Sequence, residues 1–357
     1  MWPVEKRTSG NAWRLLLVAL LILVLVWGPR AEGQEASGLY PARQSGKWGY
    51  IDKAGRLAIP PRFDDALGFT EGLAAVRIRE KWGYVDGAGR IAIQLQFVER
   101  QQAQSDPPGR GALPFAEGLA AVEIGGRWGF INKAGKVVIR PKFDSAFSFA
   151  EGLAAVSIGE KWGYIDQTGV FVIQAQFVAG HPANPAAHSF AEGLAAVVIG
   201  HKMGYIDKAG NILISPQFPS VQDFSQGLAA VQVTNGKFGY IDRAGKLVIQ
   251  PRFEVAYAFN EGLTWVKKSF DGKGGYIDRT GRVTIQPQFD DGDSFAEGFA
   301  PVEVGSKWGY IDRAGRMTIQ PQFDYAIPFA QGLGQVEIGE KWGYIDKIGR
   351  YVWRPTN

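Results

Sequence analysis

The sequence predicts an all-β protein made of nine tandem three-stranded antiparallel meander repeats, arranged as an open superhelical array. The first observation is a Lys-Trp-Gly-Tyr motif that recurs from Lys47 to Tyr344. Its Trp position falls at 48, 82, 128, 162, 203, 238, 274, 308 and 342, so successive copies are 34 to 46 residues apart. The second observation is that each copy holds three short apolar runs separated by glycine-containing turns, which is typical of strands and hairpins.

The central strand of each unit is represented by residues 161–166. Strand alternation places Trp162 and Tyr164 on one face and Gly163 on the other, and a glycine here lets a neighbouring backbone come close. An Asp-x-x-Gly turn follows this strand, as at residues 52–55. The Asp side chain accepts hydrogen bonds from its own backbone, and the Gly takes the left-handed conformation. Asn132 replaces the Asp in one copy, so the turn requires an acceptor rather than a charge.

The links between units carry two Phe residues, normally six apart. Such strict recurrence of large apolar groups is what a continuous core between units requires. Two links are longer, because insertions at 98–113 and 178–189 separate Phe97 from Phe115 and Phe177 from Phe190. Both insertions follow the first Phe of a link, so we expect them on the same side of the array.

No unit is obviously split across the termini, as a ring-closing strand exchange would require. The first unit begins with a degenerate strand at Gly38, Leu39 and Tyr40. The expectation is therefore an open array. The alternative is a closed, propeller-like ring, because a count from Trp48 lets the first strand complete the last unit.

One unit lacks the aromatic residue at the Trp position, where it has Gly274. The preceding strand of the same unit carries Trp265 where other units have Ala. We therefore expect the Trp265 ring to replace the missing one in the core.

The recurring pattern EGLAAV, KWGYID, Gly and Phe resembles the WG-repeat (KWG-repeat) family of bacterial β-rich repeat proteins over residues 37–357. The resemblance implies a β-repeat fold, often in exported proteins. It implies no catalytic residues that can be transferred to this chain.

The N-terminal region differs from the repeats. Lys6, Arg7 and Arg14 precede an uncharged run at 15–27, which is short for a membrane-spanning helix and typical of a secretory signal peptide. We therefore divide the chain into a signal peptide, 1–33, and a WG-repeat domain, 34–357. The expected location is the periplasm or the outside of a bacterial cell. The alternative is an anchor in the inner membrane through residues 15–27. The absence of Cys excludes structural disulfides.

The charge balance argues against nucleic-acid binding. The whole chain carries 39 basic and 35 acidic residues, and residues 1–33 account for four and two of them, so residues 34–357 have a net charge of about +2. The recurring Asp residues are explained by their turns, and no Ser/His/Asp set or phosphate-binding loop can be assembled. The three His residues of this Cys-free chain are too few for a typical zinc site, so neither a metal nor another cofactor is expected.

The predicted function is an exported repeat scaffold that binds a protein or a cell-surface polymer, without catalysis. We expect no nucleic-acid partner, and contact with a membrane only through an uncleaved N-terminal segment. The alternative is an envelope hydrolase whose site lies at the inserted loops, 98–113 and 178–189. The candidate binding residues are Gln101, Gln104, Asp106, His181, Asn184 and His188. For the hydrolase alternative the insertions offer only Glu99, Asp106, His181, His188 and Ser189. They lie in the Pro-containing insertions, and loops inserted on one face of a repeat array are a common place for specificity.

Cleavage of the signal peptide is directly testable. Ala31, Glu32 and Gly33 offer small residues where a signal peptidase acts, so the mature N-terminus should lie near Gln34. Mass spectrometry of the protein from its native host checks this, and a protein that retains Met1 in the cytoplasm would contradict it.

Overall fold

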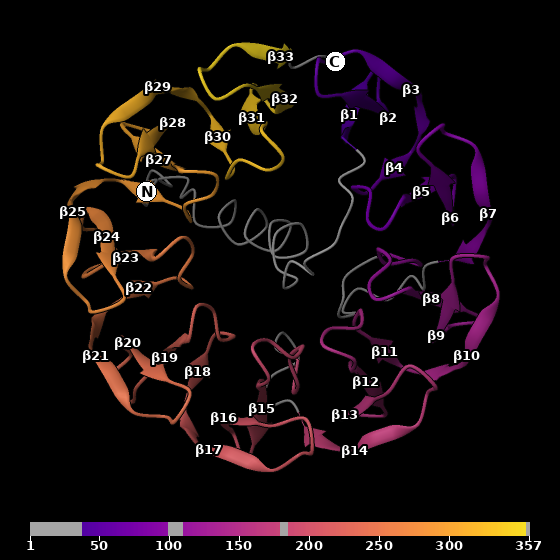
Figure 1. Cartoon of the computed structure of the whole chain (residues 1–357), viewed down its shortest axis with the longest axis horizontal. Helices are drawn as coiled ribbons and strands as arrows, with labels where there is room; N and C mark the ends of the chain where they lie inside the picture. Colours follow the sequence, from indigo (N-terminus) through magenta and orange to yellow (C-terminus); the bar gives the residue numbers. More distant parts are fainter. Residues whose placement is uncertain (1–37, 99–109, 179–184, 355–357) are drawn as a thin grey trace, which may run out of the picture. The chain divides into compact units, whose positions relative to one another are not determined.

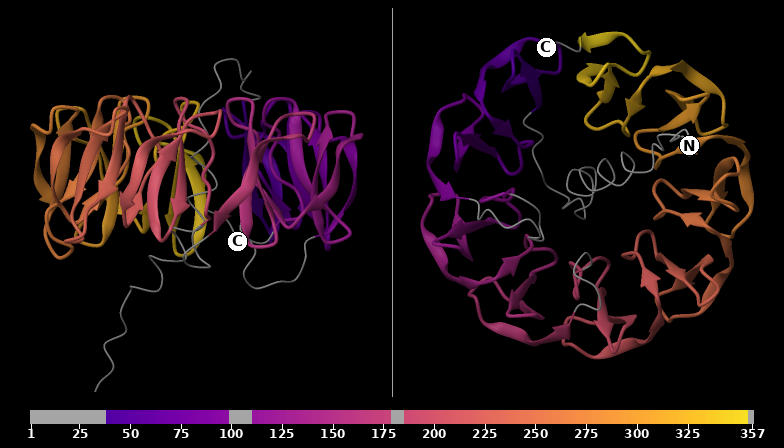
Figure 2. Two further views of the ribbon diagram at one scale, coloured as in Figure 1. Left: turned by 90° about the horizontal axis from the view of Figure 1, so that it is seen from below. Right: turned by 180° about the vertical axis from the view of Figure 1, so that it is seen from behind.

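The computed structural model describes residues 38–98, 110–178 and 185–354, so the predicted signal peptide lies outside the described residues. Within these ranges the chain forms 33 strands in nine antiparallel sheets. None of the described residues lies in a helix that is long and apolar enough to cross a membrane. The sheets, which we call blades 1 to 9 in chain order, follow one another around a ring (Figure 1). The strands run between the two faces of this ring (Figure 2).

Each blade is a meander that starts at the inner circumference of the ring and ends at the outer one (Figure 1). Short inner strands are present in six blades: β4 (Asp65–Ala66), β11 (Ser145–Ala146), β18 (Ser220–Val221), β22 (Val255–Ala256), β26 (Asp291–Gly292) and β30 (Tyr325–Ala326). The second strands are β1 (Leu39–Gln44), β5 (Leu73–Ile78), β8 (Leu119–Ile124), β12 (Ala154–Ile158), β15 (Ala195–Ile199), β19 (Leu228–Gln232), β23 (Leu263–Lys267), β27 (Phe299–Val304) and β31 (Gly334–Ile338).

The third strands carry the repeated Trp-Gly-Tyr motif. They are β2 (Lys47–Asp52), β6 (Lys81–Asp86), β9 (Arg127–Asn132), β13 (Lys161–Ile165), β16 (Lys202–Ile206), β20 (Phe238–Asp242), β24 (Gly274–Asp278), β28 (Lys307–Asp312) and β32 (Lys341–Ile345). The outer strands are β3 (Leu57–Phe63), β7 (Ile91–Val98), β10 (Val137–Phe143), β14 (Phe171–Val178), β17 (Ile212–Phe218), β21 (Leu247–Phe253), β25 (Val283–Phe289), β29 (Met317–Phe323) and β33 (Tyr351–Trp353).

The predicted three-stranded unit is thus extended by a short inner strand. The link that follows an outer strand supplies the first strand of the next blade, as β4 does by pairing with β5. In blades 3 and 5, which follow the insertions, single bridges replace the inner strand, Ala112 to Val122 and Ala187 to Val197. Each two-Phe link therefore begins on the outer strand of one blade and ends within the next blade.

The Asp-x-x-Gly turns form as predicted. The Asp52 carboxylate accepts the backbone N–H groups of Ala54 and Arg56, both at 2.9 Å, and Gly55 has a φ of +79°. These hydrogen bonds, that from Arg56 first, lower the pKa of Asp52. Asn132 makes the same two bonds at 3.1 and 3.0 Å, so a neutral acceptor suffices.

The glycine of the motif is required by the outer strand. A Cβ on Gly163 would lie 2.6 Å from the carbonyl oxygen of Ile173 and 2.7 Å from the backbone nitrogen of Ala175. The outer strand bulges at this point, where its register against β13 shifts. Any larger residue would push the two strands apart.

The core lies between blades, as the two-Phe links predicted. The second Phe of each link packs against the Tyr of the preceding blade. Tyr50 and Phe69 have ring centroids 4.8 Å apart in an edge-on arrangement. Their equivalents, at 4.8 or 4.9 Å, are Tyr84–Phe115, Phe130–Phe149, Tyr164–Phe190, Tyr205–Phe224, Tyr240–Phe259, Tyr276–Phe295 and Tyr310–Phe329.

The prediction of an open array is wrong, because blade 9 packs against blade 1 and closes a nine-bladed propeller (Figure 1). The hydroxyl of Tyr344 in blade 9 donates to the carbonyl of Pro41 in blade 1 at 2.8 Å. Tyr40 donates in the opposite direction, to the carbonyl of Gln331 at 2.7 Å. The rings of Tyr40 and Tyr344 lie 5.6 Å apart. The ring therefore closes through side chains and does not need a strand exchanged between the ends of the chain.

The first strand of blade 1 looks degenerate because it is adapted to this closure. Tyr40 stands where blade 2 has Ala74, and it is 7% exposed. Burial, together with the charge of Glu297, raises the pKa of Tyr40 to about 12, so the hydroxyl remains protonated and can donate.

The structure confirms that Trp265 replaces the Trp missing at position 274. Its side chain is fully buried, and a Cβ on Gly274 would collide with its ring. Gly292 on β26 is equally close, since a Cβ there would lie 2.7 Å from the Trp265 ring. One indole ring therefore fills space next to two glycines, one in blade 7 and one in blade 8.

Trp265→Ala should destabilise the protein by about 3–5 kcal/mol, as expected for truncation of a core aromatic ring. Chemical denaturation measures the loss. Gly274→Trp in the Trp265→Ala background should recover part of it, because it restores the arrangement of the other blades. Gly274→Trp alone should destabilise, since both rings cannot occupy the same space. Ala75→Gly is the control at the equivalent position of blade 2, and an equal loss there would contradict the assignment.

Candidate functional site

The two insertions leave and re-enter the ring at equivalent points. The outer strands before them are each one residue longer than usual, so that Val98 pairs with Lys81 and Val178 pairs with Lys161. Both residues lie beside the hairpin between the second and third strands. The predicted common side of the two insertions is therefore confirmed for their described ends, and we call this side the first-hairpin face.

Of the predicted site residues, Gln101, Gln104, Asp106, His181 and Asn184 lie outside the described residues. His188 is described, and it connects blades. Its Nδ1 lies 2.8 Å from Oδ1 of Asp223 in blade 6, and its backbone carbonyl accepts the hydroxyl of Tyr164 in blade 4 at 2.7 Å.

The repeated Glu residues also connect blades. The backbone N–H of Gly118 in blade 3 donates to the Glu71 carboxylate of blade 2 at 3.1 Å, and Lys133 lies 3.1 Å from the same carboxylate. Gln226 makes the equivalent bond to Gly262 at 2.8 Å, so an amide can replace the carboxylate. The other acceptors in this series are Glu117, Glu151, Glu192, Glu261 and Glu297.

The cations that precede the Trp position are partly neutralised. Five of them pair with an acid in the following link, as Lys237 does with Glu254 at 2.7 Å. The other four pairs are Lys47–Asp64, Arg127–Asp144, Lys273–Asp290 and Lys307–Asp324. These five repeated cations thus have structural partners, and we looked for a ligand site where the repeat pattern breaks.

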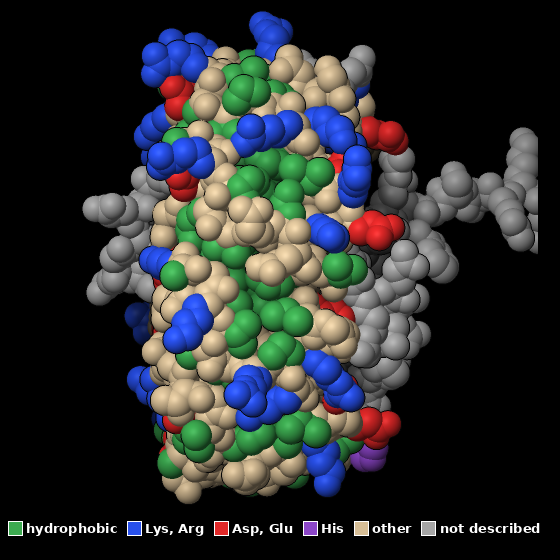
Figure 3. Space-filling view, turned by 90° about the vertical axis from the view of Figure 1, so that its right-hand side faces the viewer, with side chains coloured by type: hydrophobic (Ala, Val, Ile, Leu, Met, Phe, Trp, Pro, Cys, Tyr) green, Lys and Arg blue, Asp and Glu red, His purple; other side chains and the backbone are tan. Residues whose placement is uncertain are grey.

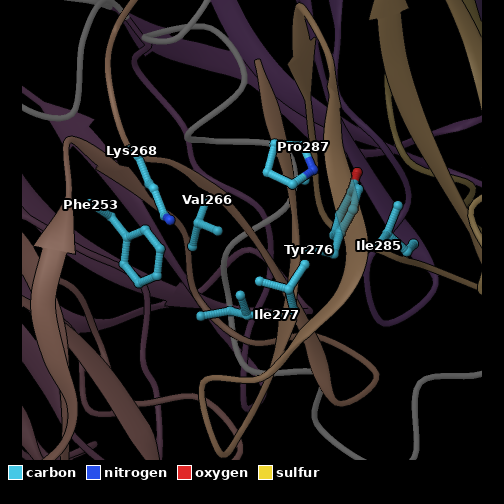
Figure 4. A pocket seen from close by; sticks show the side chains of 9 residues that line it. Phe253, Val266, Lys268, Tyr276, Ile277, Ile285 and Pro287 are labelled. Carbon is cyan, nitrogen blue, oxygen red and sulfur yellow. The ribbon is translucent and has the colours of Figure 1, made fainter. Parts of the chain in front are cut away.

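Two cavities in the described part of the chain do not mark such a site. The apolar pocket shown in Figure 4 lies between blades 6 and 7, near Phe253, Val266 and Ile285, and has a volume of only about 20 Å³. That is room for about one water molecule. A wider depression of about 710 Å³ lies where blades 8, 9 and 1 meet, and its acids Glu297 and Asp346 are already bonded to Lys347 and Arg350.

The repeat pattern breaks most clearly on the inner circumference at blade 8. The inner strand β26 carries Asp291, which is paired across the sheet with Glu303 of β27, and Asp293 follows the strand. We call Asp291, Asp293 and Glu303 the acidic wall. Tyr257, from the inner segment of blade 7, and Tyr325, from β30 of blade 9, lie on either side along the inner circumference.

The three carboxyl groups of the acidic wall all have a raised pKa. Burial raises the pKa of Asp293, and the nearby charge of Asp291 raises it further. Burial likewise raises the pKa of Asp291 and of Glu303, although Lys267 partly opposes the shift in both. The pKa of Tyr257 and the pKa of Tyr325 are raised by burial, and the charges of Asp291 and Asp293 raise both further.

Trp265 positions the inner strand that carries Asp291 of the acidic wall. Other inner strands have Ala or Val at the position of Gly292, as in Ala256 and Ala326. Gly292 leaves room for the indole of Trp265, which fixes the inner strand of blade 8 against blade 7. The backbone N–H groups of Gly292 and Ser294 donate to the carboxylates of Asp291 and Asp293 at 2.9 and 2.6 Å.

Three carboxylates between two tyrosines are suited to a cationic group, because carboxylates attract charge and aromatic faces stabilise cations. Clusters of perturbed titratable groups are common at functional sites. Among the residues that the structure describes, no three His, Cys, Asp or Glu side chains are grouped as metal ligands.

The sequence contained a signal for this site that residue-by-residue comparison of the links reveals. Residues 290–293 read Asp-Asp-Gly-Asp, whereas the equivalent residues 324–327 contain one acid. The signal is easy to miss, because recurring Asp residues are accounted for by turns. The same unit follows the one that lacks its Trp, so two departures from the repeat coincide at one blade junction.

The family model described as "WG containing repeat" matches residues 48–82, 111–128, 128–162, 162–202, 203–238, 238–273, 275–308 and 308–342. These segments cover well over half of the chain and extend from blade 1 to blade 9. A search of curated proteins finds no match.

Solved structures show a similar fold. A crystal structure of a eukaryotic initiation factor has a TM-score of 0.61 and 11% identity, over 88% of this chain and 94% of that chain. The BamB protein of Moraxella catarrhalis has a TM-score of 0.44 and 11% identity, over 79% and 93%. The streptogramin B lyase has a TM-score of 0.38 and 16% identity, over 66% and 93%. At such identities the similarity concerns the fold alone.

The acidic wall predicts a pH-dependent effect of Asp293→Asn. A raised pKa means that the folded state binds the proton more tightly than the unfolded state, so the carboxylate costs stability once the unfolded group ionises, above about pH 4. The variant should therefore melt at a higher temperature than the wild type at pH 7, and the difference should shrink as the pH falls towards 4.

Asp52→Asn is the matched control, because the pKa of Asp52 is lowered. Its carboxylate contributes stability above the unfolded pKa, and that contribution is lost on acidification. This variant should melt lower than the wild type at pH 7. Melting curves between pH 3 and 8 test both, and a destabilised Asp293→Asn at pH 7 would contradict the account.

Proposed function

The chain belongs to the WG repeat family, and on this premise we propose that it is a binding scaffold without catalytic activity. Its partner is a protein that presents a positively charged segment, and the segment binds at the acidic wall between Tyr257 and Tyr325. The observation that carries the proposal is the position of three acids in blade 8, where Asp291 is paired across the sheet with Glu303 and Asp293 follows the same inner strand. Burial raises the pKa of all three.

These carboxylates lower the stability of the fold, and this supports a role in binding. A fold selected for stability alone would not keep partly buried acids side by side, since each disfavours the charge of the other. Residues retained against stability are commonly found where function needs them. A lysine or arginine side chain would neutralise the wall and lower the pKa of each acid.

A protein partner is favoured over an acidic surface polymer. A polymer with negative charges would need a stripe of free cations, whereas five of the nine cations at the Trp position pair with acids, as Lys237 does. The acidic wall has the wrong sign for such a polymer. We further propose that the scaffold works in the periplasm or outside the cell, in agreement with the basic and apolar N-terminal segment.

Titration calorimetry with a lysine-rich peptide tests the proposal directly. The wild type should bind this peptide with an affinity that falls as salt is added, and it should not bind a glutamate-rich peptide. Asp291→Asn with Asp293→Asn should weaken binding at least about tenfold, since a hydrogen bond to a charged group contributes about 1.5–3 kcal/mol.

The control is Asp52→Asn with Asp86→Asn, which changes the net charge equally but alters only two turns. This variant should bind the peptide within about twofold of the wild type. If both variants weakened peptide binding equally, the change in net charge alone would explain the effect, and the proposal would be overturned.

The insertions provide a second comparison. A variant with both long links restored to the six-residue Phe spacing should keep its affinity for the peptide. Loss of binding in this variant, with no loss in the acidic-wall variant, would move the site to 98–113 and 178–189.

A further inference from the structure

The outer strands form the circumference of the ring, and each has one edge that no described strand pairs with (Figure 1). Proteins usually protect such edges with charged residues or proline, because an exposed apolar edge pairs with other chains. Figure 3 views the rim on the side of blades 1 to 3, where Lys and Arg lie among apolar side chains. Blades 1 and 2 carry Arg56 and Arg90, whose side chains are about 80% exposed.

Proline protects most of the outer strands as well. Six of them have Pro as their fifth residue: Pro61, Pro141, Pro216, Pro251, Pro287 and Pro321. Two strands lack it, β7 with Leu95 and β14 with Ala175. These two are also the longest outer strands, with eight residues each.

Only β14 lacks both kinds of protection among the described full-length outer strands. The residue after the turn glycine is a cation in blades 2 and 3, as in Arg90 and Lys136, but it is Val170 in blade 4. No charged residue occurs between 170 and 178. Val170, Val172 and Val178 are 60%, 45% and 42% exposed. Blade 4 therefore presents a strand edge without charge or proline, and the bulge of β14 is the one protection that it shares with the other outer strands.

The order of the exposed side chains along β14 is palindromic. They are Val172, Gln174, Gln176 and Val178, which alternate with less exposed residues. If two copies of β14 pair antiparallel about a twofold axis through Ala175, each Val172 lies opposite Val178 of the second copy. Each Gln174 then lies opposite Gln176 of the second copy. In this arrangement the valine side chains of one copy face those of the other. The glutamine amides of the two copies also face each other and can form hydrogen bonds.

We propose that β14 is a homodimer interface, in which two copies of the protein join their blade 4 sheets edge to edge around this axis. A second copy fits better than an unrelated strand, because the pattern is complementary to itself. The distribution of exposed charge also favours blade 4 as the dimer interface. Two copies that met at the outer strands of blades 2 or 3 would bring exposed cations together. The outer strand of blade 4 and Asn211, which precedes the outer strand of blade 5, bring none.

Sedimentation analysis of the purified full-length protein tests the proposal. The wild type should be a dimer that dissociates on dilution. Val172→Lys should shift the protein to monomer, because it places a lysine in the interface opposite an apolar residue. Val248→Lys on β21 is the matched control, since Val248 is 42% exposed at the equivalent position, and it should leave the dimer intact.

A covalent test locates the axis. The chain has no cysteine, so Ala175→Cys introduces a single thiol next to its own copy in the second molecule. Opposed residues of antiparallel strands have Cα atoms about 4.5–5.5 Å apart, within the range of a disulfide. Mild oxidation should give a linked dimer from Ala175→Cys and not from Pro251→Cys.

Ala175→Pro completes the design, because six other blades tolerate Pro at this position. It should fold with an unchanged circular dichroism spectrum and be monomeric. A wild type that remains monomeric at about 100 μM would overturn the proposal, as would a dimer that survives both Val172→Lys and Ala175→Pro. Equal dissociation by Val248→Lys would also overturn it, since the contact would then not be specific to β14.

Discussion

The hydrogen bond from a buried tyrosine to the backbone of the next blade is the interaction on which the ring depends. Tyr50 donates to the carbonyl of Leu67 at 2.8 Å, and Tyr84 to that of Leu113 at 2.7 Å. The series continues around the ring and ends with Tyr344 and Pro41. Because a buried hydroxyl without a partner is costly, each bond sets both the distance and the orientation of two blades. Phe130 has no hydroxyl but keeps the ring contact with Phe149, so packing supplies the burial and the hydrogen bonds add orientation.

Much of the fold could be predicted, because its determinants are local. The turn at Asp52, the close approach over Gly163 and the two-Phe links each follow from a few neighbouring residues. Closure could not be predicted in the same way. It depends on a small angle between successive blades that accumulates over nine steps, and no single residue encodes it. The residues that complete the ring, Tyr40 and Pro41, looked like a degenerate strand because their partners are about 300 positions away in the chain.

The candidate site was harder to predict than the fold for a related reason. In a repeat protein the recurring residues hold neighbouring units together, and here Glu71 and Lys237 do so. Function is then expected where one copy departs from the others. The insertions were an obvious departure, and the six candidate residues were chosen from them. His188 turned out to join blades through Asp223. The acidic wall was a less visible departure, since an extra Asp in a chain full of turn-forming Asp residues carries little signal until the neighbours are known.

The two departures proposed to have a function lie on different parts of the ring, and this makes them compatible. The acidic wall is on the inner circumference at blades 7 to 9, whereas β14 is on the outer circumference at blade 4 (Figure 1). Dimerisation through β14 therefore leaves the acidic wall uncovered. Antiparallel pairing about a twofold axis also reverses the direction of the strands, which run between the two faces of each ring. Each side of such a dimer then presents the first-hairpin face of one copy next to the opposite face of the other.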